Sequence, residues 1–265
     1  MTNKQASFAK RYLEVSRSKN SILCVGLDPA VPEQRKENVL ANNDRLAFMK
    51  QIIKEVSPFA SVIKINRQYI IGLTNEQIAD LNKLIHRNGM LSIIDHKLSD
   101  IGSTNASAIY WIKKEGFDAF TFSPFAGNIG EATKEAHKND LGIIVLTLMS
   151  NPESSIQKET KIGNKSLYIY IAEECRRNNS DACVVGATGN VTTIDLLNIK
   201  KVVGENILLL VPGVGAQGGD AENIIQVFGK NLMINVGRSI IYSDNPGEIA
   251  ENFQRQFNKL YSNIM

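Results

Sequence analysis

Short runs of Val, Ile and Leu alternate with longer amphipathic stretches from one end of the chain to the other. The runs have the length of strands and are nearly continuous in apolar residues, which is typical of parallel strands buried on both faces. We predict eight strands: Ser21–Asp28, Ser61–Asn66, Met90–Lys97, Ala119–Ser123, Gly142–Thr147, Ala182–Ala187, Ile207–Val211 and Leu232–Val236.

Each predicted strand is followed by a stretch in which apolar residues recur at helical spacing. These stretches are Asp44–Val56, Asn75–Arg87, Asn105–Lys114, Gly130–His137, Lys165–Arg176, Thr193–Val202, Ala221–Phe228 and Glu248–Tyr261. A helix between consecutive strands allows parallel pairing, so the pattern predicts the α/β class. Eight such units favour a closed (β/α)8 TIM barrel over an open doubly wound sheet. No G-x-G-x-x-G follows the first strand, which weakens the dinucleotide-binding alternative.

The chain shows no linker, low-complexity tract or sharp change of composition. We therefore expect a single barrel domain over residues 1–265. Within residues 1–20, Ala6–Ser16 is expected to form a helix that caps the bottom of the barrel. The length of 265 residues agrees with one barrel of roughly 250 residues.

Composition narrows the class of partner. A formal net charge of +3, without a basic run, disfavours nucleic acid and suits a small anionic substrate. The three cysteines are widely spaced, which disfavours disulfides and a zinc site and favours a reducing compartment. The first twenty residues do not resemble a signal peptide, and no run is long and apolar enough for a membrane span. We expect a cytoplasmic protein that contacts no membrane.

The most informative polar residues lie at the predicted carboxyl ends of the strands, where barrel enzymes carry their active sites. Asp95 and Lys97 are two apart on one strand and should point to the same face, beside Lys64 at the end of the preceding strand. Carboxylate neighbours would keep Lys97 protonated, and a fixed ammonium is a ready proton donor. A purely structural row of salt bridges is the alternative interpretation.

Two further segments indicate a phosphate site. Pro212–Gly219 is a glycine-rich strand-to-helix loop, and Gly237-Arg238 follows the eighth strand. Barrels often hold phosphate in the loops after strands 7 and 8, and a guanidinium suits phosphate oxygens. A plain tight turn would explain the loop taken alone, but the adjacent Gly-Arg favours anion binding.

Together these motifs resemble the orotidine 5′-monophosphate decarboxylase family, in its longer stand-alone bacterial branch. The resemblance runs from about Asn20 to Tyr242. Its motifs are D-x-K-x-x-D-I-G-x-T from Asp95 to Thr104, the P-G-V-G-A-Q-G-G loop, the terminal G-R, the L-C-V-G-L-D-P opening and V-G-A-T. The first motif is shared across a superfamily, whereas the whole ordered set is specific to this family.

The resemblance implies a cofactor-free and metal-free decarboxylation of orotidine 5′-monophosphate, the last step of pyrimidine nucleotide synthesis. Lys97 would protonate the ring carbon that loses carbon dioxide, Asp95 would crowd the substrate carboxylate, and Lys64 would also contact ribose. Asp100 and Thr104 match residues that enter the neighbouring subunit's site, so a homodimer with shared sites is implied. The implied substrate-binding residues are Asp28 at a ribose hydroxyl, Ser150 and Pro212 at the base, and Gln217, Gly237 and Arg238 at the phosphate.

Two rival functions remain open. A sugar-phosphate lyase of the same superfamily would bind magnesium through a carboxylate at the position of Lys64, where a cation is unsuitable. A catalytically inactive nucleotide-binding barrel would usually lack Lys97 or Asp95, both present here.

The motifs assign no role to Arg67 or to the three histidines. Arg67 is interpreted as a solvated charge at a strand end, with a second anion contact as the alternative. His96 should point away from its neighbours and serve packing or an interface, and His86 and His137 are expected at the surface.

Overall fold

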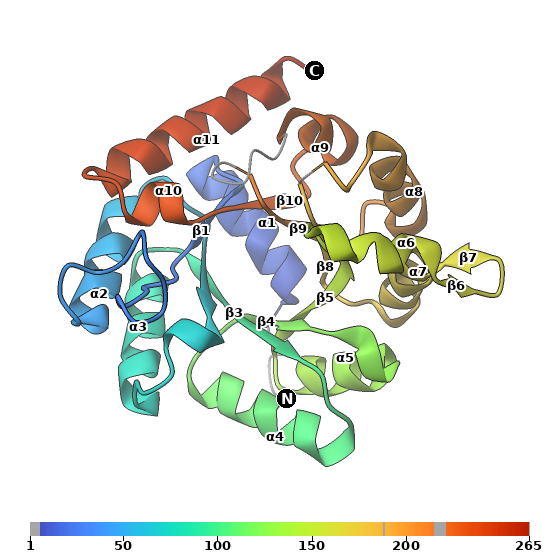
Figure 1. Ribbon diagram of the computed structural model, residues 1–265, viewed down its shortest axis with the longest axis horizontal. Coiled ribbons are helices and arrows are strands. Elements are labelled where there is room, and N and C mark those ends of the chain that lie inside the picture. Colours follow the sequence, from blue (N-terminus) through green and yellow to red (C-terminus); the bar gives the residue numbers. More distant parts are fainter. Residues whose placement is uncertain (1–5, 188, 215–220, 265) are drawn as a thin grey trace.

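Eight parallel strands form a closed barrel surrounded by helices (Figure 1). The computed structural model describes residues 6–187, 189–214 and 221–264. The barrel strands are β1 (Leu23–Gly26), β2 (Val62–Asn66), β3 (Leu91–Leu98), β4 (Ala119–Phe122), β5 (Gly142–Leu148), β8 (Ala182–Val185), β9 (Leu208–Pro212) and β10 (Leu232–Val236). The ring closes where β1 pairs with both β2 and β10. The predicted (β/α)8 barrel is therefore confirmed.

The outer helices lie close to the predicted amphipathic stretches. They are α2 (Arg45–Val56), α3 (Asn75–Arg87), α4 (Gly102–Lys114), α5 (Ile129–Lys138), α7 (Leu167–Asn178), α8 (Thr193–Val203), α9 (Ala221–Phe228) and α11 (Pro246–Ser262). Capping boxes at Thr74–Gln77 and Thr192–Asp195 start α3 and α8, because each pair satisfies backbone N–H groups of the first turn.

The first helix, α1 (Phe8–Lys19), lies across the middle of the ring of strands in Figure 1. Its Phe8 and Tyr12 are buried and pack in one cluster with inward-facing barrel residues such as Val62 and Ile144. The Tyr12 hydroxyl also donates to the carbonyl of Leu232. The helix thus closes one end of the barrel with two aromatic side chains.

Several short elements interrupt the regular repeat and had not been predicted. They are η1 (Arg67–Tyr69), η2 (Pro124–Ala126), η3 (Pro152–Ser154), α6 (Ser155–Glu159), the hairpin strands β6 (Lys161–Ile162) and β7 (Lys165–Ser166), and α10 (Arg238–Ile241). The hairpin occupies the start of the predicted helix Lys165–Arg176, so α7 begins two residues later. Figure 1 shows this hairpin projecting from the side of the barrel.

Side chains along the strands alternate between two cores. Val62, Ile93 and Ala119 belong to the cluster inside the barrel, whereas Ile63 and Ile94 pack in the cluster beneath the outer helices. Two-residue periodicity causes this alternation. Among the described residues, no helix is long and apolar enough to cross a membrane.

Candidate active site

Three neighbouring strands place polar residues at inward positions near their carboxyl ends. Lys64 on β2 is two residues after the inward Val62, and Asp95 on β3 is two residues after the inward Ile93. Thr121 occupies the corresponding position on β4, two residues after Ala119. The alternation that builds the apolar interior therefore delivers an ammonium, a carboxylate and a hydroxyl to one place.

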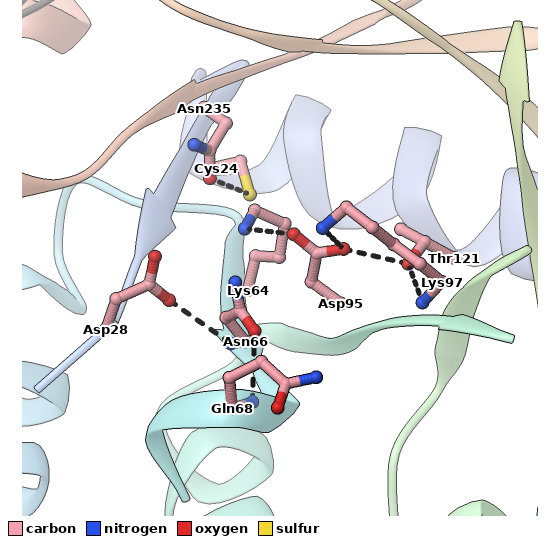
Figure 2. A network of polar contacts seen from close by, with 9 residues as sticks. All are labelled: Cys24, Asp28, Lys64, Asn66, Gln68, Asp95, Lys97, Thr121 and Asn235. Carbon is pink, nitrogen blue, oxygen red and sulfur yellow. Dashed lines mark hydrogen bonds and ion pairs between the residues drawn. The ribbon is translucent and has the colours of Figure 1, made fainter. Parts of the chain in front are cut away.

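These residues form a continuous polar network with Lys97 (Figure 2). Lys64 Nζ lies 3.1 Å from Asp95 Oδ2, and Lys97 Nζ lies 2.7 Å from Asp95 Oδ1. The Thr121 hydroxyl donates to Asp95 Oδ1 at 2.9 Å. Asp95 is thus held between two ammonium groups, as the sequence predicts.

The backbone at Lys97 differs from an ordinary strand. Lys97 has a φ of +51°, and the register between β3 and β4 shifts between Ile94 and Leu98. The Lys97 N–H donates to Thr121 Oγ1 at 2.9 Å, so one hydroxyl holds both this irregular backbone and the Asp95 carboxylate. A left-handed conformation is unfavourable for a lysine and is often found at functional sites. Strand alternation correctly predicts the contact between Lys97 and Asp95, but it does not predict the left-handed backbone at Lys97.

The electrostatics of the network favour charged forms of Lys64 and Asp95. Burial opposes the charge of Lys64, which is 5% exposed, but the carboxylates of Asp95 and Asp28 outweigh it and raise the pKa of Lys64. Burial likewise opposes ionisation of Asp95, but Lys64 and Lys97 together hold its pKa well below the ordinary range. The Lys97 side chain is 43% exposed, so its ammonium can reach a ligand while it remains paired.

A cavity of about 400 Å³ adjoins this network. Its lining residues are Asp28, Arg35, Lys64, Asn66, Tyr69, Pro212, Gly213, Val214, Asn235, Gly237 and Arg238. The predicted ribose, base and phosphate contacts Asp28, Pro212, Gly237 and Arg238 therefore share one cavity with Lys64. Gln217, predicted at the phosphate, lies outside the described residues.

Close backbone approach explains two glycines that follow the carboxyl ends of strands. A Cβ on Gly237 would lie 3.2 Å from the carbonyl oxygen of Gly26, where β10 meets β1. A Cβ on Gly186 would lie 2.6 Å from the Cα of Ser150, which follows β5. The second contact shows that only glycine lets the Ser150 segment pack against the end of β8.

The remaining predicted residues are not among those that line the described cavity. Ser150 is half-buried in the bend after β5, and the Asn190 amide donates to its carbonyl at 3.4 Å. Asp100 and Thr104 lie at the start of α4, both exposed, with Ile101 between them 63% exposed. The amides of Asn105 and Asn128 donate to the carbonyl of Asp100 and fix this segment at the surface.

Sequence reasoning missed several polar residues of the site. Thr121 carries one weak signal, because it is the single hydroxyl in an otherwise apolar four-residue strand. The Asn66 N–H donates to Asp28 Oδ1 at 3.2 Å and orients that carboxylate. The Cys24 thiol lies 3.6 Å from Asn235 Oδ1, and burial raises the pKa of Cys24 to about 12, so the thiol stays protonated.

The interpretation of Arg67 as a solvated charge is wrong. Its guanidinium makes two parallel hydrogen bonds, at 2.8 and 2.6 Å, to the buried carboxylate of Glu115. The prediction that His86 and His137 lie at the surface is confirmed for His86, which is exposed, whereas His137 is half-buried. Each ring also hydrogen-bonds a buried carboxylate, that of Asp118 or Asp181 respectively.

His96 lies between the two network residues and is half-buried. Burial and the nearby Arg67 charge lower its pKa, so the ring is neutral at pH 7. Within the part of the chain that the structure describes, no group of three or more His, Cys, Asp or Glu side chains is placed to hold a metal ion.

Comparisons with known proteins point to one family. Residues 21–253 match the model of the Orotidine 5′-phosphate decarboxylase / HUMPS family. The chain is 30% identical over 256 residues to an orotidine 5′-phosphate decarboxylase of Cupriavidus metallidurans, covering 92% of each protein. It is 31% identical over 262 residues to the same-named protein of Thermomicrobium roseum, covering 93% of this chain and 90% of that one. The solved structure of the Leishmania donovani OMP decarboxylase superposes with a TM-score of 0.80 at 23% identity, over 97% of this chain and 99% of that chain.

Proposed function

Because the chain belongs to the Orotidine 5′-phosphate decarboxylase / HUMPS family, we propose that it converts orotidine 5′-monophosphate to uridine 5′-monophosphate and carbon dioxide. The observation that carries this proposal is the position of Asp95 between the ammonium groups of Lys64 and Lys97, beside a cavity with a guanidinium at its rim. The reaction would serve pyrimidine nucleotide synthesis in the cytoplasm. We assign the whole of residues 1–265 to one catalytic domain.

In the proposed reaction, the bond between the pyrimidine ring and its carboxylate breaks. Carbon dioxide leaves, and the electron pair stays on the ring carbon, where it cannot delocalise into a conjugated system. The ammonium of Lys97 stabilises the developing charge and transfers one proton to that carbon, and the neutral amine then regains a proton from water. Asp95 orients Lys97 and crowds the departing carboxylate.

The substrate would be held through groups remote from the reacting carbon. Asp28 and Lys64 would contact ribose, Ser150 and Pro212 the base, and the phosphate-binding residues are Gln217, Gly237 and Arg238. Binding energy gained at the phosphate can hold the ring in its reactive position. No metal or organic cofactor enters this proposal, because Lys97 itself supplies the positive charge that the ring carbon needs.

The magnesium-dependent sugar-phosphate lyases of the superfamily are the alternative reaction class. Lys64 argues against them, since its buried, charged ammonium occupies the position where they need a carboxylate ligand. The test is the fall in absorbance of orotidine 5′-monophosphate on addition of purified protein in the presence of chelator. Release of one carbon dioxide for each uridine 5′-monophosphate formed is expected. A folded protein that is inactive with chelator but acts on a sugar phosphate with magnesium would reject the proposal.

We also propose a homodimer in which Asp100 and Thr104 of one subunit complete the site of the other. Their exposure at the start of α4, beside the exposed Ile101, supports this assignment. Mixing inactive Asp100→Ala and Lys97→Ala chains should restore about a quarter of the wild-type activity, because half of the dimers are mixed and each has one intact site.

The control for this mixing experiment is the pair Asp95→Ala and Lys97→Ala. Both of these substitutions affect the part of the site that one chain supplies, so no mixed dimer has an intact site. Equal activity in the two mixtures, or none in the first, would contradict shared sites.

A further inference from the structure

Arg35 is a charged residue of the cavity that the proposed reaction has not used. It lies in the loop that joins β1 to α2, and its side chain lines the same cavity as Lys64, Gly237 and Arg238. The loop thus brings a second guanidinium to the cavity. Arg35 lies near the start of the chain, whereas Arg238 lies near its end.

The side chain is held in place by aromatic rings and a carbonyl. The Arg35 guanidinium carbon lies 5.7 Å from the ring centre of Tyr69 and 5.2 Å from that of Tyr242. Its Nε donates to the carbonyl of Asn38 at 2.8 Å, and one terminal nitrogen donates to the same oxygen. Such contacts orient a guanidinium without neutralising it.

Tyr242 is itself fixed, so the support under Arg35 is firm. The Tyr242 hydroxyl accepts from the N–H of Ala30 at 2.8 Å and donates to the carbonyl of Asp28 at 3.2 Å. The ring stacks on Phe48 of α2 with centres 5.6 Å apart. Tyr242 therefore contacts both the Arg35 guanidinium and the backbone of Asp28, the proposed ribose contact.

The charge of Arg35 is available to a ligand. Within residues 6–187, 189–214 and 221–264, no carboxylate forms an ion pair with it, and its hydrogen bonds there go to a neutral carbonyl. Arg67, by contrast, is neutralised by two hydrogen bonds to Glu115. Two guanidinium groups lining one cavity repel each other, and a doubly charged anion between them would relieve that repulsion.

We propose that Arg35 binds the phosphate of the nucleotide together with Arg238. This inference rests on the proposed function, because it names a further contact for the same substrate. A carboxylate or a neutral sugar would gain less from two forked donors than a phosphate dianion, which offers three terminal oxygens. Arg35 would therefore set the preference for a phosphorylated ligand over the free nucleoside.

The test compares the binding of uridine 5′-monophosphate and uridine, by titration calorimetry, to wild type and Arg35→Gln. Loss of a charge-assisted contact should weaken uridine 5′-monophosphate binding by about 10- to 100-fold and leave uridine binding unchanged. Arg35→Lys should recover part of the lost affinity, because the charge returns without the fork. Lys36→Ala is the matched control, since it removes an exposed neighbouring charge and should change neither affinity.

The possible failures can be distinguished. If Arg35→Gln weakens both ligands equally, Arg35 only supports the loop, and the inference is overturned. Unchanged binding of both ligands overturns it as well. If the wild type neither binds uridine 5′-monophosphate nor decarboxylates orotidine 5′-monophosphate, the proposed function fails and the inference with it. An active wild type with an unaltered phosphate preference in Arg35→Gln rejects the Arg35 inference alone.

Discussion

Carboxylates with nearby basic side chains occur at both ends of this barrel, half-buried at the carboxyl end and buried at the amino end. At the carboxyl end, Asp95 binds the ammonium groups of Lys64 and Lys97 and the hydroxyl of Thr121. At the amino end, Asp118 binds the guanidinium of Arg11, the ring of His86 at 2.8 Å, and the backbone N–H of Ser92 at 2.8 Å.

The difference lies in what surrounds each carboxylate. Asp118 accepts a hydrogen bond from a backbone N–H and contacts residues of α1, α3 and β3, all of which pack in the core. Asp181 repeats this arrangement before β8, with donors at His137, Ala9 and Ile143. Among the described residues, the donors to Asp95 are all side chains, and they adjoin a cavity. Similar charged groups therefore join elements of the fold at one end and border a cavity at the other, and the carboxyl end is where barrel enzymes carry their active sites.

The largest effect that this comparison predicts is for Lys97→Ala. Loss of the proposed proton donor should lower kcat by about 10³-fold, while the free energy of unfolding changes by less than about 1 kcal/mol, because the side chain is partly exposed. Steady-state decarboxylation and urea unfolding measure the two quantities. Lys83→Ala on α3, which also removes an ion-paired lysine, should leave kcat unchanged. A Lys97→Ala protein that keeps more than a tenth of the activity would exclude Lys97 as the donor.

The next largest effect is expected for Asp118→Asn at the amino end, which should lower stability and leave activity nearly unchanged. Arg11 would lose its buried partner, so the free energy of unfolding should fall by about 3 kcal/mol. At a temperature well below melting, kcat should stay within about twofold of the wild-type value. Asp80→Asn on α3 removes an exposed carboxylate paired with Lys83 and should leave the free energy of unfolding nearly unchanged, because water screens exposed ion pairs. A large loss of kcat in folded Asp118→Asn would show that the two ends are not independent.

A smaller effect is expected for Thr121→Val, which keeps the shape of the side chain and removes its hydroxyl. Asp95 would lose one hydrogen bond and the Lys97 N–H its acceptor, so kcat should fall about tenfold with little change in KM. Thr133→Val on α5 removes a buried hydroxyl that contacts Ser180 and should leave kcat unchanged. Equal kcat values for the two variants would mean that Thr121 does not position Lys97.

The sequence predicts the carboxyl end better than the amino end, for physical reasons. Lys64 and Asp95 follow from two-residue periodicity, because an inward charge at a strand end stands out in an apolar run. The partners of Asp118 come from α1 and α3, up to 107 residues away, and no local pattern marks them. For the same reason the pairing of Arg67 with Glu115, 48 residues apart, could not be seen in the sequence.

Local irregularities were also beyond prediction. The left-handed backbone of Lys97 is hydrogen-bonded to the Thr121 hydroxyl of the next strand, which is a tertiary contact rather than a local propensity. The hairpin β6–β7 has strands of only two residues, too short for a periodic signal. By contrast, the strands and the outer helices carry long apolar patterns, and their predicted bounds agree with the structure to within a few residues at most ends.

The smallest effect concerns acid, and it tests whether Asp118 acts through its charge. Burial opposes ionisation of Asp118, but His86, Arg11 and the N–H of Ser92 outweigh it and hold its pKa below the ordinary value of 3.8. Near that pH the unfolded chain binds more protons than the native protein, so the contribution of Asp118 is present above pH 3.8 and is lost as the pH falls through the lower native value. The stability difference between wild type and Asp118→Asn should therefore shrink as the pH is lowered from about 6 to about 3, as measured by urea unfolding at each pH.

Because Asp95 is present in both proteins, its own titration cancels in the difference. A difference that stays constant with pH would mean that Asp118 stabilises the amino end through hydrogen bonds and packing alone, and the contrast with Asp95 would then be one of charge as well as of surroundings.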